Sequence, residues 1–232
     1  MPVNIQKKMK TLNQAIDAWQ REYKEQGGRL FCGRGCSNCC TLYVRITGVE
    51  ALHIAGQLTP EQSGKLKLHV DKMKLHAGGS ASMTDFLHRA RFKVGPCPFL
   101  DPDGACGIYQ CRPFACRGML STRPAEWCGA DFSLLHPLEK EAYRSGLDRE
   151  VVAWPTHYVE ATQYMAEAQE GDVVAWMTES WGFRLVGSLG YLVWLVRESE
   201  AMSDLSDMAG AAEFFAEKGR EFPYLLTLDR GC

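Results

Sequence analysis

The sequence predicts a mainly α-helical protein with a small β-hairpin, in which a cysteine-rich metal-binding module packs against a helical C-terminal region. Three observations lead to this prediction. Apolar residues recur at helical spacing near the N-terminus, nine of the ten cysteines lie between residues 32 and 128, and residues 131–231 contain no cysteine. We therefore expect a cysteine-cluster region over residues 1–130 and a helical region over 131–232. No low-complexity linker separates them, so we expect the two regions to pack as one unit.

Length and charge exclude some classes of protein. The chain has 232 residues, of which 46% are hydrophobic, so it can bury a core without disulfide staples. Its 26 basic and 28 acidic residues give a net charge of −2, whereas a protein that binds nucleic acid by neutralising phosphates carries a surplus of Lys and Arg. Nucleic acid is therefore not an expected partner.

The chain shows no sign of export or membrane insertion. Its first residues, MPVNIQKKMK, have no apolar core of signal-peptide length. The most apolar stretch, 185–196, is too short for a membrane span, which needs about 20 residues, and we interpret it as a buried helix. We expect a cytoplasmic protein whose thiols stay reduced, and reduced clustered cysteines are typically metal ligands or redox groups.

The N-terminal elements follow from helix and strand signals. Apolar residues from Ile5 to Tyr23 recur at steps of three and four, which predicts a helix that docks on the protein's own core and ends at Gly27-Gly28; a dimerising coiled coil is the alternative. Alternation over 42–47 predicts a short strand. Thr47 with Glu50 forms a capping box that opens the next helix, so we assign Glu50 to capping rather than to catalysis.

Similar signals continue to the second cysteine group. Thr59-Pro60 opens a helix that ends near 78–79, and a shorter helix covers about 84–92. Around the turn Asp101-Pro-Asp-Gly104 we expect a small hairpin with Cys97 and Cys106 near its base. The proline of Arg112-Pro113 then opens a helix that carries Cys116 and Arg117.

The C-terminal region reads as helices throughout. The expected segments are 137–150, 156–169, 171–181, 184–199 and 207–219. The six histidines are scattered, so we expect them to lie on helix surfaces or in the core rather than to bind metal. Cys232, the final residue, is expected to be an exposed thiol.

The spacing of the cysteines indicates a metal site. Cys32, Cys36, Cys39 and Cys40 form the pattern C-x3-C-x2-C-C, and a C-x2-C turn can direct two thiolates at one cation. Adjacent Cys39 and Cys40 point in different directions in extended chain, so they serve two metals or one of them stays unbound. The second group can supply the remaining ligands: Cys97, Cys106, Cys111, Cys116 and Cys128. Four thiolates complete either a zinc site or an iron–sulfur cluster, and spacing alone does not choose between them.

Several ordered motifs resemble the YkgJ-type cysteine-cluster family, a zinc- or iron-chelating CxxCxxCC domain. The motifs are CGRGCSNCC, VRITGVEAL, CPFL, DPDGAC and IYQCRPFACR, over roughly residues 30–120. The resemblance implies metal-ligand roles for Cys32, Cys36, Cys39, Cys40, Cys97, Cys106 and Cys116. It implies metal chelation more firmly than any reaction.

The chain departs from the family pattern at three cysteines. The family usually opens with C-x2-C, whereas three residues separate Cys32 from Cys36. Cys111 and Cys128 look like additions, either as extra ligands or as small core residues. Arg112 and Arg117 match the family's RP and CR positions, and we expect them to donate hydrogen bonds to carbonyls or to the metal-bound sulfurs.

Three functions remain open at this point. The leading hypothesis is a metalloprotein that holds an iron–sulfur cluster or zinc, with redox or group-transfer chemistry. A structural zinc module that presents its helical half to a protein partner is the second. The third is an S-adenosylmethionine-dependent methyltransferase, since flagellin lysine N-methylases carry a similar cysteine cluster. A radical S-adenosylmethionine enzyme is disfavoured, because Asn38 stands where an aromatic residue is usual.

Overall fold

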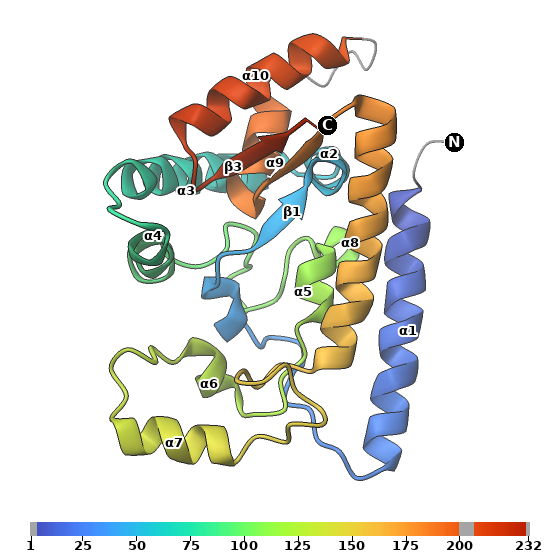
Figure 1. Cartoon of the computed structure of the whole chain (residues 1–232), viewed down its shortest axis with the longest axis vertical. Helices are drawn as coiled ribbons and strands as arrows, with labels where there is room; N and C mark the ends of the chain where they lie inside the picture. Colours follow the sequence, from blue (N-terminus) through green and yellow to red (C-terminus); the bar gives the residue numbers. More distant parts are fainter. Residues whose placement is uncertain (1–3, 200–206, 231–232) are drawn as a thin grey trace.

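The computed structural model describes residues 4–199 and 207–230, which form a mainly helical protein with one antiparallel three-stranded sheet (Figure 1). The predicted fold class is confirmed. Cys232 lies outside the described residues.

The first helix, α1 (Ile5–Glu25), docks on the core as its apolar stripe predicts. Asn4 caps it by accepting a hydrogen bond from the Lys7 backbone N–H at 2.9 Å. Met9, Leu12 and Ile16 are buried in the main core. The face that these residues occupy packs against α8 (Glu160–Trp181), and the two long helices run side by side in opposite directions (Figure 1).

The sheet has the order β1 (Arg45–Thr47), β2 (Arg184–Ser188) and β3 (Leu226–Asp229). Ile46 pairs with Gly187, and Leu185 pairs with Leu228. The central strand therefore comes from the segment that we expected to be wholly helical. An apolar run does not distinguish a buried strand from a buried helix, and here the run divides into β2 and helix α9 (Leu189–Glu198).

The capping box predicted at Thr47 is present, and the helix start predicted at Thr59 also carries a capping box. Thr47 opens α2 (Gly48–Ala55), and Thr59 opens α3 (Pro60–Gly78). In each box the threonine hydroxyl accepts from the third helical N–H, while the side chain at that position accepts from the threonine N–H.

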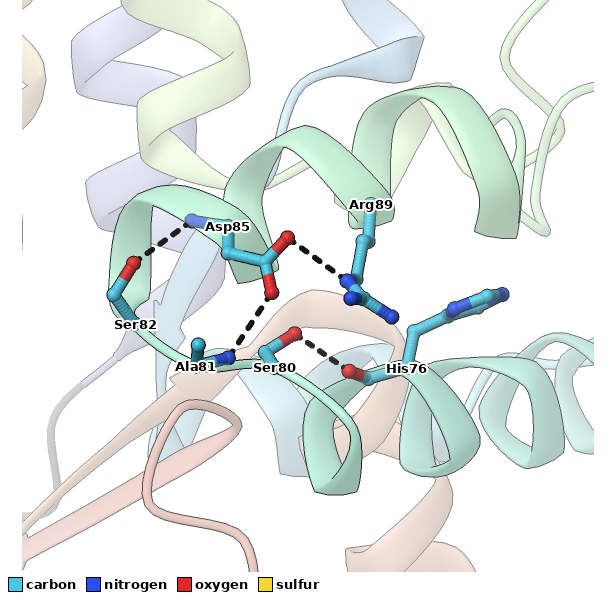
Figure 2. A network of polar contacts seen from close by, with 6 residues as sticks. All are labelled: His76, Ser80, Ala81, Ser82, Asp85 and Arg89. Carbon is cyan, nitrogen blue, oxygen red and sulfur yellow. Dashed lines mark hydrogen bonds and ion pairs between the residues drawn. The ribbon is translucent and has the colours of Figure 1, made fainter.

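The turn between α3 and α4 (Met83–Arg89) is fixed by short-range polar contacts (Figure 2). Ser82 Oγ accepts from the Asp85 N–H at 3.2 Å, and the Asp85 carboxylate accepts from Ala81 N and Arg89 Nε. The helix continues as a single π-helical turn, η2 (Ala90–Val94). Since Ala90 and Val94 line the cavity described below, this turn sets the position of one of its walls.

The C-terminal half departs from the predicted helices in three places. The segments 156–169 and 171–181 form one helix, α8, which passes through Gly171. Helix α7 (Pro137–Ser145) ends earlier than expected, whereas α10 (Met208–Glu221) agrees closely with the predicted range. Strand β3 was not expected, because four residues carry too short an alternation to be recognised.

The expected hairpin around Cys97 and Cys106 is reduced to a tight turn. Asp101 N–H donates to Ala105 O at 2.8 Å, and a single bridge joins Leu100 to Cys106. Gly104 has a φ of +80°, and a Cβ added to it would lie 2.9 Å from the Gly35 carbonyl oxygen, so the turn packs on the first cysteine loop. Contact with another loop therefore takes the place of strand pairing.

Helix α5 (Phe114–Gly118) crosses α8 at close range, and this contact gives a first prediction. A Cβ at Gly118 would lie 2.7 Å from Thr162 O and 2.8 Å from Ala166 Cβ. Gly118→Ala is therefore expected to lower the free energy of unfolding by about 1–3 kcal/mol through overpacking, measured by urea denaturation. Gly171→Ala is the matched control: nothing lies within 4 Å of the added carbon, so it is expected to raise stability by about 0.5–1 kcal/mol. Equal effects of the two substitutions would contradict the close crossing.

Among the described residues, every helix is too short or too polar to cross a bilayer.

Candidate metal centre

The first cysteine loop carries two of its thiols, Cys39 and Cys40, on a short 3₁₀ turn, η1 (Asn38–Thr41). Cys40 N–H donates to Ser37 O at 2.9 Å, and Leu42 N–H donates to Cys39 O at 3.0 Å. Cys97 N–H donates to Cys40 O at 2.8 Å. The two cysteine groups, far apart in the sequence, are thus joined directly by a backbone hydrogen bond.

Six cysteines from the two groups line one cavity of about 120 Å³. They are Cys36, Cys39, Cys40, Cys97, Cys106 and Cys116. All six are among the seven that the family resemblance marks as ligands. The seventh, Cys32, is exposed and lies outside the lining, as do the buried Cys111 and Cys128.

The remaining walls of the cavity are mainly apolar. Leu42 and Val44 follow the first cysteine loop, and Met73 reaches the cavity from α3. His69, one turn before Met73, also lines it, and burial lowers the pKa of this imidazole to about 4. A neutral imidazole and apolar side chains therefore face the thiols, and no sequence signal had pointed to His69.

Four of the cavity thiols have a pKa raised above the usual value for cysteine. Burial raises the pKa of Cys97 and of Cys116 to about 12, and it also raises the pKa of Cys106. The pKa of Cys39 is raised by its hydrogen bond with Cys40 and by burial. Neighbouring cysteines also raise these pKa values, because a thiolate disfavours the ionisation of another thiol close to it. Cys39 and Cys106 both raise the pKa of Cys97 and of Cys116 in this way.

No three His, Cys, Asp or Glu side chains in the described part of the chain are placed so that they could hold one metal ion. The six thiols therefore surround the cavity without converging on a single point. A mononuclear tetrahedral site requires convergence, with neighbouring sulfurs about 3.8 Å apart for metal–sulfur bonds of about 2.3 Å.

A comparison with family models assigns this region. Residues 31–133 match the family described as "Putative zinc- or iron-chelating domain", with the signature CxxCxxCC. This part of the chain resembles a CxxCxxCC domain. The match includes all nine clustered cysteines, and it supports metal binding without choosing between zinc and iron. Comparisons with curated proteins and with solved structures found no match.

Within the part of the chain that the structure describes, Arg112 is the one Lys, Arg, Asp or Glu side chain that lines the cavity of the CxxCxxCC domain. Its guanidinium carbon lies 4.8 Å from the centre of the Tyr109 ring, and its Nε is buried without a hydrogen-bond partner among the described residues. Its positive charge lowers the pKa of Cys39, Cys106 and Cys116, against the larger effect of burial on Cys106 and Cys116. An unpaired donor beside three thiols is placed to interact with sulfur once those thiols ionise.

Arg117 does not line the cavity and donates hydrogen bonds to backbone carbonyls instead. It is 3% exposed and donates hydrogen bonds to Arg112 O at 2.6 Å, Gln110 O at 2.8 Å and Asn13 Oδ1 at 2.7 Å. Arg117 therefore ties α5 to the preceding segment, which includes η3 (Tyr109–Cys111), and to α1. These contacts fix the backbone positions of Arg112 and of Cys116, which directly precedes Arg117 in α5.

Glu50 positions the same helix from the opposite side. Its Oε2 accepts from the N–H and the hydroxyl of Thr47, as the capping box predicts, while Oε1 accepts from Phe114 N–H at 2.9 Å. Phe114 is the first residue of α5, so one buried carboxylate caps α2 and α5 together. No sequence pattern could reveal the second contact, because 64 residues separate its partners.

Cys32 and Cys128 lie together outside the cavity. Cys32 Sγ accepts from Ser121 N–H at 3.2 Å. Burial raises the pKa of the Cys32 thiol to about 11, and the nearby Cys128 adds to this effect. Cys128, in α6 (Ala125–Gly129), lies 3.2 Å from His157 Nε2, and His157 Nδ1 lies 2.7 Å from the Tyr143 hydroxyl. His157 is thus a hydrogen-bonded core residue, as expected of the histidines. Cys111 is also in the main core.

The thiol pKa values predict how metal binding depends on pH. Cysteine binds metal as thiolate, whereas burial raises the pKa of Cys97 and of Cys116 to about 12 and keeps both protonated at neutral pH, so binding is expected to release about one proton from each of them that is recruited. Metal affinity is therefore expected to rise with pH. Calorimetric titration of the apo protein at pH 7, in two buffers of different ionisation enthalpy, measures the protons released. A net release of less than about one proton would contradict the protonated state of the cavity.

Proposed function

We propose that the CxxCxxCC domain holds an iron–sulfur cluster through four of the six cysteines that line its cavity. The observation that carries this proposal is the arrangement of the thiols: six surround one cavity, yet no three described donors are placed for a single ion. The thiolates of a polynuclear cluster bind different iron atoms and therefore stand farther apart than the ligands of one zinc ion.

The charge and polarity of the cavity support the same assignment. Thiolate donors suit iron–sulfur clusters, and hydrogen bonds to the sulfurs stabilise the negative charge of the bound group. Arg112 supplies a cation and a buried donor at this place, while the apolar walls exclude water. When bound, such a cluster supplies one-electron transfer, which is the redox role that we propose. The cytoplasm as location, and the division of the chain at residue 130, remain predictions.

Anaerobic purification of the full chain, followed by iron, zinc and sulfide analysis and a visible spectrum, tests the proposal. We expect iron and acid-labile sulfide in stoichiometric amounts, with broad visible absorption that a reductant bleaches. Stoichiometric zinc without sulfide would overturn the cluster in favour of a zinc site. Absence of both metals would overturn metal binding itself.

A further inference from the structure

A second hollow, of about 420 Å³, lies between the end of α1, the start of α8 and residues 150–151. It shares no lining residue with the cysteine cavity. Nothing in the proposed metal chemistry uses it, so its own lining must indicate what it could bind.

Aromatic rings form part of this lining. Trp19 and Tyr23, one turn apart on α1, stack with ring centres 4.9 Å apart and an interplanar angle of 17°. Tyr164 on α8 also lines the hollow and is 65% exposed, although tyrosine has a large apolar ring. Aromatic faces attract cations, because the ring quadrupole places negative charge above and below the plane.

Carboxylates complete the lining. Glu22, Glu150 and Glu160 reach the hollow from α1, the 150–151 segment and α8, and no Lys or Arg lines it. Within the described ranges, none of these three glutamates takes part in an ion pair. The hollow thus combines three unneutralised negative charges with aromatic walls.

The basic residues next to the lining residues in the chain, Arg21, Lys24 and Arg149, do not line the hollow themselves. Arg149 precedes Glu150 but stacks on Trp154, with 4.7 Å between its guanidinium carbon and the ring centre. The positive end of α8 is matched by Glu160 in its own first turn. The hollow therefore keeps a negative electrostatic potential.

The walls are fixed before any ligand arrives. Glu160 N–H donates to Val151 O at 3.0 Å, which ties the 150–151 segment to α8. Gly28 N–H donates to Tyr23 O at 2.8 Å, and a Cβ at Gly28 would lie 2.4 Å from Tyr23 Cζ. The Tyr23 ring is thus held against both Trp19 and the Gly27-Gly28 turn. A preformed wall binds without the cost of ordering its side chains.

We propose that this hollow binds an organic cation, an ammonium or guanidinium group, between the aromatic rings and the three glutamates. The aromatic walls disfavour a metal ion, because a hard cation requires oxygen ligands on most sides. The cation can belong to a small molecule or to a Lys or Arg side chain of another polypeptide, since both present the same chemistry.

Calorimetric titration of the purified full-length protein with choline tests the proposal. Its neutral carbon isostere, 3,3-dimethyl-1-butanol, is the control ligand. We expect saturable binding of one choline per chain, and binding of the isostere weaker by about 10-fold, because only choline carries the charge. Equal binding of the two ligands, or no saturable binding of choline, acetyl-lysine amide or acetyl-arginine amide, would overturn the proposal. Saturable binding of calcium ions at the hollow, in place of these organic cations, would also overturn the proposal.

Two further titrations identify the source of the cation. The two amides, Nα-acetyl-lysine amide and Nα-acetyl-arginine amide, are acetylated at the α-amino group only, so they keep the side-chain cations of a polypeptide. Tighter binding of either amide than of choline supports a polypeptide side chain as the ligand, and tighter binding of choline supports a small molecule.

Variants locate the binding at the hollow. The double variant Glu150→Gln/Glu160→Gln is expected to weaken binding by about 10-fold, and Tyr164→Leu by about 3-fold. Glu25→Gln, on an exposed position of α1 outside the hollow, is expected to leave the affinity unchanged. All four replaced side chains are exposed, so folding is expected to survive, and circular dichroism checks this. Equal affinity of the double variant and the Glu25→Gln variant would overturn the location.

Discussion

Replacing Cys116 or Cys97 with alanine is expected to lower the metal content of the purified protein by more than about 10-fold. Both thiols line the cavity, and both come from the second cysteine group, which must meet the first group for the cavity to close. Loss of either one removes a proposed thiolate ligand, and the neutral His69 imidazole in the cavity wall cannot supply its negative charge. Metal and sulfide analysis after anaerobic purification measures the effect.

Cys111→Ala is the matched control for these variants. Cys111 lies five residues before Cys116 and is 3% exposed, but it belongs to the main core and does not line the cavity. We expect this variant to keep its full metal content and to lose only a modest part of its stability. If Cys111→Ala lost as much metal as Cys116→Ala, the ligand set read from the cavity would be wrong.

The second large effect is expected at Glu50. Glu50→Ala removes the acceptor of three hydrogen bonds and leaves the N–H groups of Thr47 and Phe114 without this partner, at a site that is 1% exposed. We expect the free energy of unfolding to fall by about 3–5 kcal/mol, because buried donors that lose their acceptor carry a desolvation penalty. Urea denaturation of the apo protein measures the change without any contribution from bound metal.

Thr59→Ala supplies the comparison for Glu50→Ala. Thr59 opens the other capping box, at the start of α3, where the contacts are exposed to solvent. Its loss is expected to cost about 1 kcal/mol, the usual value for an N-cap. A cost at Glu50 no larger than the cost at Thr59 would show that the contact with α5 contributes nothing.

Local signals predicted much of the fold because they depend on residues close together in the chain. Thr47 with Glu50 and Thr59 with Pro60 mark helix starts that the structure confirms, since capping is settled within one turn. The apolar stripe of α1 was likewise recognisable from its period. The segment from Arg184 was not, because only pairing with β1 and β3 makes its first five residues a strand.

Part of the candidate site could likewise be predicted from local sequence motifs, and part of it could not. The motifs around the cysteines predicted metal binding and the family, which the match over 31–133 confirms. They could not separate Cys32 from the six cysteines of the cavity, nor place Cys111 in the core. No sequence signal indicated that His69 lines the cavity or that Glu50 accepts a hydrogen bond from Phe114 N–H. In both cases the residues that meet come from distant segments of the chain.

The sequence by itself therefore determined the helical class, the caps, the cysteine motifs and the chemistry of soft thiolate donors. Only the tertiary structure decided which thiols share a cavity, that Arg112 enters it and that Arg117 does not. The physical reason is the range of the interactions. Caps and periodicity act within a few residues, whereas a cavity is enclosed by segments that meet only when the core packs.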